Sequence, residues 1–181
     1  MGDPRRFNKK YKAPNTPFEK GRMLEELKFV GKYGLRNKKE LWRHKYQLSG
    51  FRSRAREARS QPEHIQNQML NDLRNSLSKL GVIGPEAHFD DVLGLNLDSI
   101  LERRLQTQVF KQGLAKSIYQ ARQFICHRHI IVGEKVISSP SYLVKLEEQD
   151  EIKLAPNSPL QDLTLDQIEN QNGERTAEEE A

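Results

Sequence analysis

Cysteine is almost absent from this chain of 181 residues, which contains only Cys126. A single cysteine excludes an internal disulfide framework and any zinc site built from several cysteines. Long apolar runs are missing as well, because no stretch approaches the ~18 residues of a membrane-spanning helix, and we expect no membrane partner. The basic segment 1–11 has no apolar core, so we expect no secretory signal. These absences favour a reducing, cytoplasmic setting.

Positive charge is concentrated in the first third of the chain. Residues 1–59 hold 18 Lys and Arg against 6 Asp and Glu, a balance of +12, although the whole chain carries only +5. Residues 60–102 carry −5, residues 103–160 carry +4 and residues 161–181 carry −6. A strongly basic head followed by a second basic segment indicates a polyanion as partner, because Lys and Arg attract phosphate groups. The alternative, a solvated lysine-rich surface, is less favoured by so basic a block.

The two ends of the chain hold few apolar side chains. Residues 1–20 combine three prolines with six cations, which predicts a basic arm that is extended rather than helical. Alone, this arm cannot offset its own ordering entropy, so it is either disordered or ordered by a partner. Residues 161–181 are acidic, and we expect them to form a disordered tail.

A helical domain is predicted over residues 21–100. Apolar side chains three and four residues apart predict helices over residues 18–30, 38–59 and 64–80. Gly81 is well placed to end the third helix in a left-handed conformation. Glycine and proline in residues 81–96 predict a connecting loop with at most a short helical turn.

The helix predicted over residues 38–59 has a basic edge. On a wheel of about 100° per residue, five of its cations fall within about 60° of each other. They are Lys38, Lys45, Arg52, Arg56 and Arg59. An apolar stripe lies beside them and consists of Leu41, Leu48, Phe51, Ala55 and Ala58. The stripe can therefore pack on a core while the basic edge faces a phosphate backbone.

Two further helices are predicted after the loop. An apolar residue recurs at every fourth position from Leu97 to Val109, which predicts one helix that ends before Gly113. Ser117 and Gln120 match the Ser-x-x-Gln capping box, which predicts the start of a second helix.

The period of the apolar pattern then changes from 3.6 to 2. Short strands are predicted over residues 130–132, 135–137, 142–145 and 151–154. Gly133 and Glu134 suit the two central positions of a type II′ hairpin turn. The fold class is therefore α+β: a mostly helical N-terminal domain and, over residues 103–160, a small module of two helices with a short antiparallel sheet.

Five short motifs follow one another in this module. They are Arg104-Leu105 at a helix start, Gly113-Leu-Ala115-Lys-Ser117, Ala121-Arg122-Gln123-Phe-Ile125, His129-Ile-Ile-Val132 and Pro140-Ser141-Tyr142. Together they make residues 103–160 resemble the small RNA-binding module named after small-subunit ribosomal protein four, the S-four or alpha-L type.

Two positions depart from the commonest pattern of that family. Many members have aspartate where this chain has Gln106, and glutamine there is typical of the archaeal and eukaryotic branch. Many members also have Asn-Gly where this chain has Gly133-Glu134. The segment from Tyr33 to Arg43, together with the arginine-rich helix after it, is similar to the same branch. By this resemblance the chain is identified as a member of the ribosomal protein four family.

The resemblance implies a structural protein of the small ribosomal subunit, bound to ribosomes in the cytoplasm. It implies direct binding to the 5′ domain of small-subunit ribosomal RNA, early in assembly. It further implies two kinds of partner. One is the neighbouring small-subunit ribosomal proteins, and the other is messenger RNA near the channel through which that RNA enters the subunit. No cofactor is expected.

RNA-binding residues are predicted in both halves, because structured RNA is recognised largely through its backbone and 2′-hydroxyl groups. In the N-terminal half they are the cations Arg5, Arg6, Lys9, Lys10, Lys38, Lys45, Arg52, Arg56 and Arg59. In the module they are Arg103, Arg104, Lys111, Lys116, Ser117, Gln120, Arg122, Gln123, His127, His129 and Ser141. Ser117 is equally well interpreted as a helix cap. On the helical wheel, Arg104 lies close enough to the apolar residues that recur from Leu97 to Val109 to be half-buried.

Metal and enzyme interpretations are weak. Cys126, His127 and His129 are close in sequence, but zinc needs four ligands and no second cluster lies nearby. We therefore expect no metal, and a half-buried Cys126. No catalytic motif is present, and the pair Asp90-Asp91 is expected to be solvated. The alternatives to a ribosomal protein are an RNA-modifying enzyme or a free-standing stress factor that carries the same module.

Overall fold

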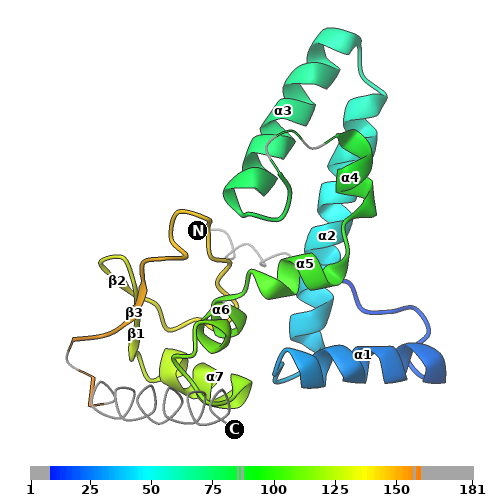
Figure 1. Ribbon diagram of the computed structural model, residues 1–181. Coiled ribbons are helices and arrows are strands. Elements are labelled where there is room, and N and C mark those ends of the chain that lie inside the picture. Colours follow the sequence, from blue (N-terminus) through cyan, green and yellow to red (C-terminus); the bar gives the residue numbers. More distant parts are fainter. Residues whose placement is uncertain (1–8, 85, 87, 157, 160–181) are drawn as a thin grey trace, which may run out of the picture. The chain divides into compact units, whose positions relative to one another are not determined.

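The computed structural model describes residues 9–84, 86, 88–156, 158 and 159 (Figure 1). The chain divides by its internal contacts into two compact units, Met1–Arg103 and Arg104–Ala181. The first unit is helical and the second combines helices with a small antiparallel sheet, which confirms the α+β class. The expectations for Arg5, Arg6 and the acidic tail fall outside the described residues.

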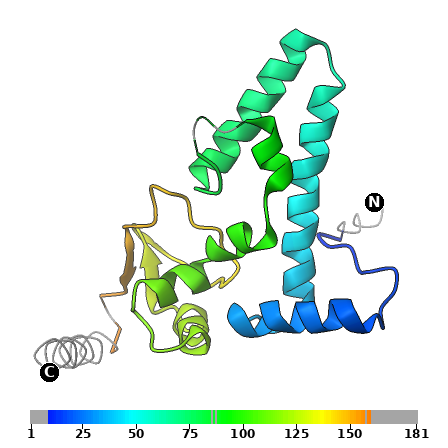
Figure 2. The ribbon, with the colours of Figure 1, turned by 45° about the vertical axis from the view of Figure 1, so that its right-hand side comes forward.

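One long helix organises the first unit. The described residues of this unit form α1 (Lys20–Lys32), α2 (Lys38–Arg59), α3 (Glu63–Lys79), α4 (Phe89–Gly94) and α5 (Leu97–Glu102). α2 contacts all of the other four, with α3 returning alongside it and α1 crossing near its first residues (Figures 1 and 2). The apolar stripe of α2 is buried, as the sequence predicts. None of the helices in the described ranges is long and apolar enough to cross a bilayer.

The helix boundaries agree with prediction where a local cap sets them. α2 has the predicted bounds, because the Asn37 side chain accepts a hydrogen bond from the Glu40 N–H at 3.1 Å and starts the helix. α1 and α3 are displaced from prediction by one or two residues. The loop expected over residues 81–96 contains a six-residue helix, α4. The Asp91 carboxylate accepts from the His88 N–H at 2.7 Å and helps to start it.

Asp98 fastens the start of α5 to the end of α1. Its carboxylate accepts from the Tyr33 hydroxyl at 2.7 Å and from the Lys32 ammonium at 2.9 Å. The hydrogen bond from Tyr33, followed by that from Lys32, holds the pKa of Asp98 below its usual value. Burial and the hydrogen bond to Asp98 raise the pKa of Tyr33 to about 12.

In the second unit, two helices pack on a small sheet. Its described residues form α6 (Leu105–Lys111), α7 (Ile118–Cys126), β1 (Ile130–Val132), β2 (Lys135–Val136) and β3 (Ile152–Leu154). The strand order is β2-β1-β3 and both pairs are antiparallel. Gly133 has a φ of 60° in the turn between β1 and β2, as the first central residue of the predicted type II′ turn requires. The core consists of Leu105, Val109, Ala115, Ala121, Phe124, Ile125, Ile130, Val132, Val144 and Ile152.

The single helix predicted from Leu97 to Gln112 is wrong, because the chain breaks between α5 and α6. Arg104 has an extended backbone, with φ −68° and ψ 140°, and forms an isolated bridge with Leu143. The next residue, Leu105, donates its N–H to the Tyr142 carbonyl at 2.8 Å. The strand predicted over residues 142–145 is wrong too, since this bridge is its only ladder contact among the described residues. Both errors have one cause, a pairing between segments far apart in sequence.

Four helices of the described chain, α1, α3, α6 and α7, end in the same way. At α3, the Gly81 N–H donates to the Ser78 carbonyl at 2.8 Å and the Val82 N–H to the Leu77 carbonyl at 3.1 Å. These two bonds define the Schellman motif, in which the residue just past the helix has a positive φ. That residue is Gly34 after α1 (57°), Gly81 after α3 (65°), Gly113 after α6 (75°) and Arg128 after α7 (65°). The helix ends predicted at Gly81 and Gly113 are confirmed.

Candidate nucleic-acid interface

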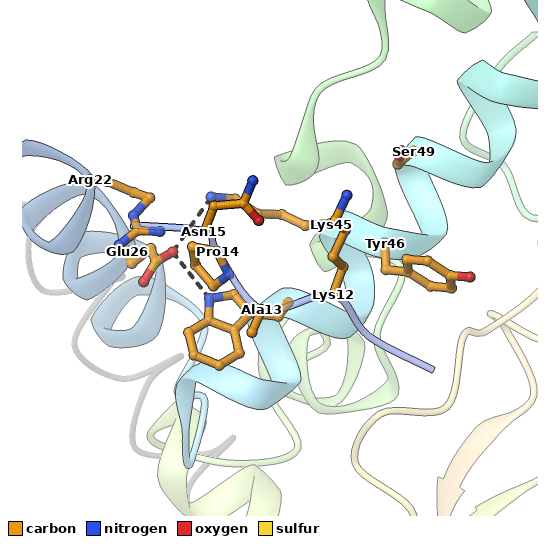
Figure 3. Close-up of a pocket in the computed structure, with 10 residues that line it drawn as sticks. Lys12, Ala13, Pro14, Asn15, Arg22, Glu26, Lys45, Tyr46 and Ser49 are labelled. Carbon is orange, nitrogen blue, oxygen red and sulfur yellow. Dashed lines mark hydrogen bonds and ion pairs between the residues drawn. The ribbon is translucent and has the colours of Figure 1, made fainter. Parts of the chain in front are cut away.

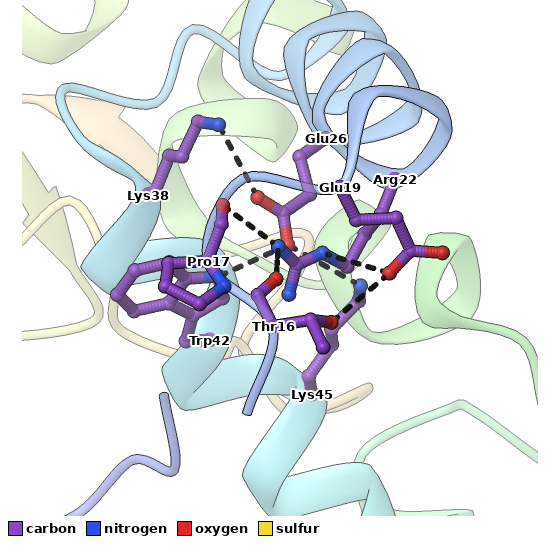
Figure 4. A network of polar contacts seen from close by, with 8 residues as sticks. All are labelled: Thr16, Pro17, Glu19, Arg22, Glu26, Lys38, Trp42 and Lys45. Atoms are coloured by element: carbon purple, nitrogen blue, oxygen red, sulfur yellow. Dashed lines mark hydrogen bonds and ion pairs between the residues drawn. The ribbon is translucent and has the colours of Figure 1, made fainter. Parts of the chain in front are cut away.

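Two cations of the basic edge of α2 surround a buried carboxylate. Glu26 of α1 is only 1% exposed, and its oxygens lie 3.4 Å from the Lys38 ammonium and 3.8 Å from the Lys45 ammonium (Figure 4). The Trp42 indole N–H also donates to Glu26, at 3.1 Å. Lys38 and Lys45 therefore balance a negative charge inside the fold, while part of each side chain stays exposed. Sequence analysis missed Glu26, because a lone acid in α1 has no spacing that marks it.

The other cations of that edge differ in their surroundings. Arg52 is half-buried and donates to the Leu95 carbonyl at 2.6 Å, which links α2 to the segment before α5. Arg56 and Arg59 are exposed in the last turns of α2. The helical wheel treats all five cations alike, whereas the structure places Lys38 and Lys45 beside Glu26 and bonds Arg52 to the Leu95 carbonyl.

The described part of the basic arm packs against α1 and α2. Residues 9–19 form no helix or strand. The Arg22 guanidinium of α1 donates to the carbonyls of Thr16 and Pro17, the latter at 3.0 Å (Figure 4). The Tyr11 ring stacks on Trp42, with centroids 6.3 Å apart. These contacts hold the arm beside the basic edge of α2.

A pocket of about 290 Å³ lies between the arm and these two helices (Figure 3). Residues that line it include Lys12, Asn15, Arg22, Glu26, Lys45 and Tyr46. The cations at this pocket outnumber the one carboxylate, so its surroundings are basic. Lys9 and Lys10, just before it in the arm, are exposed.

The first turn of α7 is capped by two side chains that the sequence marks as candidates for RNA contact. The Ser117 hydroxyl accepts from the Gln120 N–H at 3.2 Å, so the predicted cap is confirmed. The Gln120 side-chain oxygen accepts from the Lys116 N–H at 2.7 Å, one residue before the usual partner in a capping box. The Lys116 side chain itself is exposed.

Arg122 is positioned by a buried glutamine. Gln106 is 0% exposed and donates through Nε2 to the Ile118 carbonyl at 2.9 Å. Its side-chain oxygen accepts from the Arg122 guanidinium at 3.2 Å. Gln106 therefore connects α6 to α7 and fixes the half-buried Arg122. Sequence analysis recognised Gln106 as a branch marker and missed this positioning role.

The end of α7 carries exposed polar groups. Gln123, Cys126 and His127 are exposed, so the expectation of a half-buried Cys126 is wrong. The His127 ring stacks on that of His129 with centroids 6.2 Å apart. His129 is half-buried, and its Nδ1 lies 3.1 Å from the Ser158 hydroxyl. Among the described residues, no three His, Cys, Asp or Glu side chains are grouped so as to hold a metal ion.

The remaining predicted residues divide by burial. Arg103 and Arg104 are 9% and 0% exposed, and burial lowers the pKa of the Arg103 guanidinium. Both side chains are thus shielded from solvent, and Arg104 is more buried than expected. Lys111 and Ser141 are exposed, and the Ser141 hydroxyl lies 3.2 Å from that of Ser139.

Comparison with known proteins gives matches to the module and to most of the chain. Residues 103–152 match the S4 domain family. Small ribosomal subunit protein uS4 of Ignicoccus hospitalis is 45% identical over 159 residues, which cover 88% of this chain and 96% of that protein. Proteins of the same name from Hyperthermus butylicus and Methanococcus aeolicus are 46% and 49% identical to this chain. Each match again covers 88% of this chain, and it covers 90% and 91% of the length of those two proteins. The similarity therefore covers both units and not the module alone.

Proposed function

The chain belongs to the family of small ribosomal subunit protein uS4, and from this membership we propose that it is a structural component of the small subunit that binds small-subunit ribosomal RNA directly. The observation that carries the proposal is the identity of 45–49% over 88% of the chain. The S4 domain alone would leave an RNA-modifying enzyme or a stress factor as alternatives. Relatives of matching length that are named as ribosomal proteins favour a structural, non-enzymatic role.

The distribution of exposed cations supports RNA as the partner. Structured RNA is bound mainly through phosphates and 2′-hydroxyls, which need cations and neutral donors on rigid elements. We retain as RNA contacts the predicted residues that the structure leaves at least partly exposed. In the first unit these are Lys9, Lys10, Lys38, Lys45, Arg52, Arg56 and Arg59, and in the second Lys111, Lys116, Ser117, Gln120, Arg122, Gln123, His127, His129 and Ser141.

The finer parts of the proposal rest on the family resemblance. The RNA contact is with the 5′ domain, and early binding there helps to nucleate assembly of the subunit in the cytoplasm. The bound protein lies beside neighbouring ribosomal proteins, near the channel through which messenger RNA enters.

Two measurements test the proposal. A tagged chain expressed in a methanogenic archaeon should sediment with small subunits through a gradient and remain bound in high salt, because a structural component is buried in the particle. In filter binding at one fixed salt concentration, it should bind a transcript of the 5′ domain more tightly than a transcript of another domain of the same RNA. Release at high salt would contradict the structural role, and equal affinities would contradict the 5′-domain assignment.

A further inference from the structure

Arg128 is the exception among the four matching helix ends. α1, α3 and α6 end with glycine in the left-handed position, and only α7 has a side chain there. Among the described residues other than glycine, Arg128 alone has a positive φ. In this region the Cβ of an L-residue lies too close to the following carbonyl oxygen, so glycine is favoured over arginine. The chain thus keeps an unfavourable residue at a position where it elsewhere uses glycine.

In the described part of the second unit, the side chain of Arg128 makes no polar contact that offsets this strain. Arg128 is exposed, and within the part of the chain that the structure describes its guanidinium has no hydrogen bond or ion pair. Its backbone, by contrast, is fixed: the Arg128 N–H donates to the Ile125 carbonyl at 3.0 Å and the His129 N–H to the Phe124 carbonyl at 2.9 Å. The left-handed turn therefore holds the Cα–Cβ bond of Arg128 in one direction, with the charged end in solvent.

We propose that Arg128 binds a phosphate of the RNA backbone, and that this contact is why arginine occupies a glycine position. The inference rests on the proposed function, which supplies the RNA. A guanidinium can donate two parallel N–H bonds to one phosphate, and a backbone fixed in advance reduces what binding must order. The net positive charge of residues 103–160 favours an anion as the ligand of this module, and the exposed ring of the adjacent His127 offers a further hydrogen-bonding group.

The test is a variant series in which stability and RNA binding change in opposite directions. Arg128→Gly should melt roughly 2–4 °C higher, because the strain is relieved. It should bind a 5′-domain transcript roughly tenfold more weakly, with a salt slope smaller by about 1, because one phosphate contact is lost. Asparagine tolerates the left-handed region without the added backbone freedom of glycine, so Arg128→Asn should also raise the melting temperature and weaken RNA binding. Arg128→Lys should keep part of the affinity and leave the melting temperature unchanged.

Lys153→Ala is the matched control, since Lys153 is exposed on β3 and the substitution removes the same charge from an ordinary strand backbone. It should weaken binding much less than Arg128→Gly. Equal losses in the two variants, wild-type affinity in Arg128→Gly, or lower melting temperatures in both neutral variants at position 128 would each overturn the proposal. Failure of the unaltered chain to bind the transcript would instead defeat the proposed function, so the two failures are distinguishable.

Discussion

The basic edge of α2 and the start of α7 are both predicted from the sequence to contact RNA, yet their side chains are held in different ways. On α2, Lys38 and Lys45 lie beside the carboxylate of Glu26. At the start of α7, Ser117 and Gln120 bond to backbone N–H groups. A buried anion reduces the positive potential that a phosphate meets, whereas a cap orders a helix end without changing its charge. Removing the partner should therefore change both stability and RNA binding in the first region, and mainly stability in the second.

The largest effect is expected from Glu26→Ala, which removes the centre of the α2 contacts. The Trp42 N–H loses its acceptor while Lys38 and Lys45 stay close together, so the free energy of unfolding should fall by about 2–3 kcal/mol. Urea unfolding measures this. Glu25→Ala, an exposed neighbour on α1, is the control and should change stability by no more than about 0.5 kcal/mol. Similar losses in both variants would show that Glu26 has no special role.

Glu26→Gln separates charge from hydrogen bonding at the same position. The amide oxygen can still accept from Trp42, so the loss of stability should be smaller than for alanine. Lys38 and Lys45 become available to phosphates, and RNA affinity should rise with a salt slope steeper by up to ~0.7–0.9 for each added phosphate. Filter binding across a salt series measures the slope. Glu25→Gln is the control, because it has the same net charge as Glu26→Gln. An equal rise in RNA affinity in Glu25→Gln would mean that overall charge alone explains the result.

Ser117→Ala tests the other side of the comparison. Loss of the cap should lower the free energy of unfolding by about 1 kcal/mol, within a range of roughly 0.5–2. RNA affinity should not rise, because no negative charge is removed. Thermal melting measures stability and filter binding measures RNA affinity. The control is Ser138→Ala, because Ser138 is exposed and lies outside any helix. A rise in affinity in Ser117→Ala would remove the distinction between the two regions.

The smallest effect is expected at the half-buried acid Asp98. Its pKa is lower in the folded chain than the ~3.9 of an unfolded aspartate. Its contacts therefore stabilise the fold fully above about pH 4, and this contribution is lost as the pH falls through the folded pKa. Asp98→Asn should lower the melting temperature at pH 7 by less than Ser117→Ala does, and the difference from the unaltered chain should shrink as the pH falls below about 4. A difference that does not shrink as the pH falls, or that Asp72→Asn reproduces at pH 7, would contradict this account.

Features set by neighbours in sequence could be predicted. The bounds of α2, the Ser117 cap and the helix end at Gly81 depend on side chains within a few residues, so the sequence pattern indicates them correctly. The break at Arg104 could not be predicted, because the N–H of the next residue bonds to the distant Tyr142 carbonyl. Local periodicity continues through this break and therefore predicts a single helix.

The candidate site divides in the same way. A helical wheel finds the basic edge of α2, but it cannot show that Glu26 of another helix lies against that edge. Gln106 is visible as a motif residue, although its bond to Arg122 emerges only when α6 and α7 pack. Nothing in the sequence marks Arg128 as left-handed, because glycine is the usual signal for that conformation.

The small sheet of the second unit has a consequence for the protein before it meets RNA. The outer strands are β2 and β3, of two and three residues, and each carries an exposed lysine, Lys135 or Lys153. Longer and less charged edges offer unpaired N–H and carbonyl groups on which a second chain can add a strand. Short edges with lysine prevent this pairing, so the newly made chain is protected from strand-mediated aggregation while its basic surfaces are still without an anionic partner.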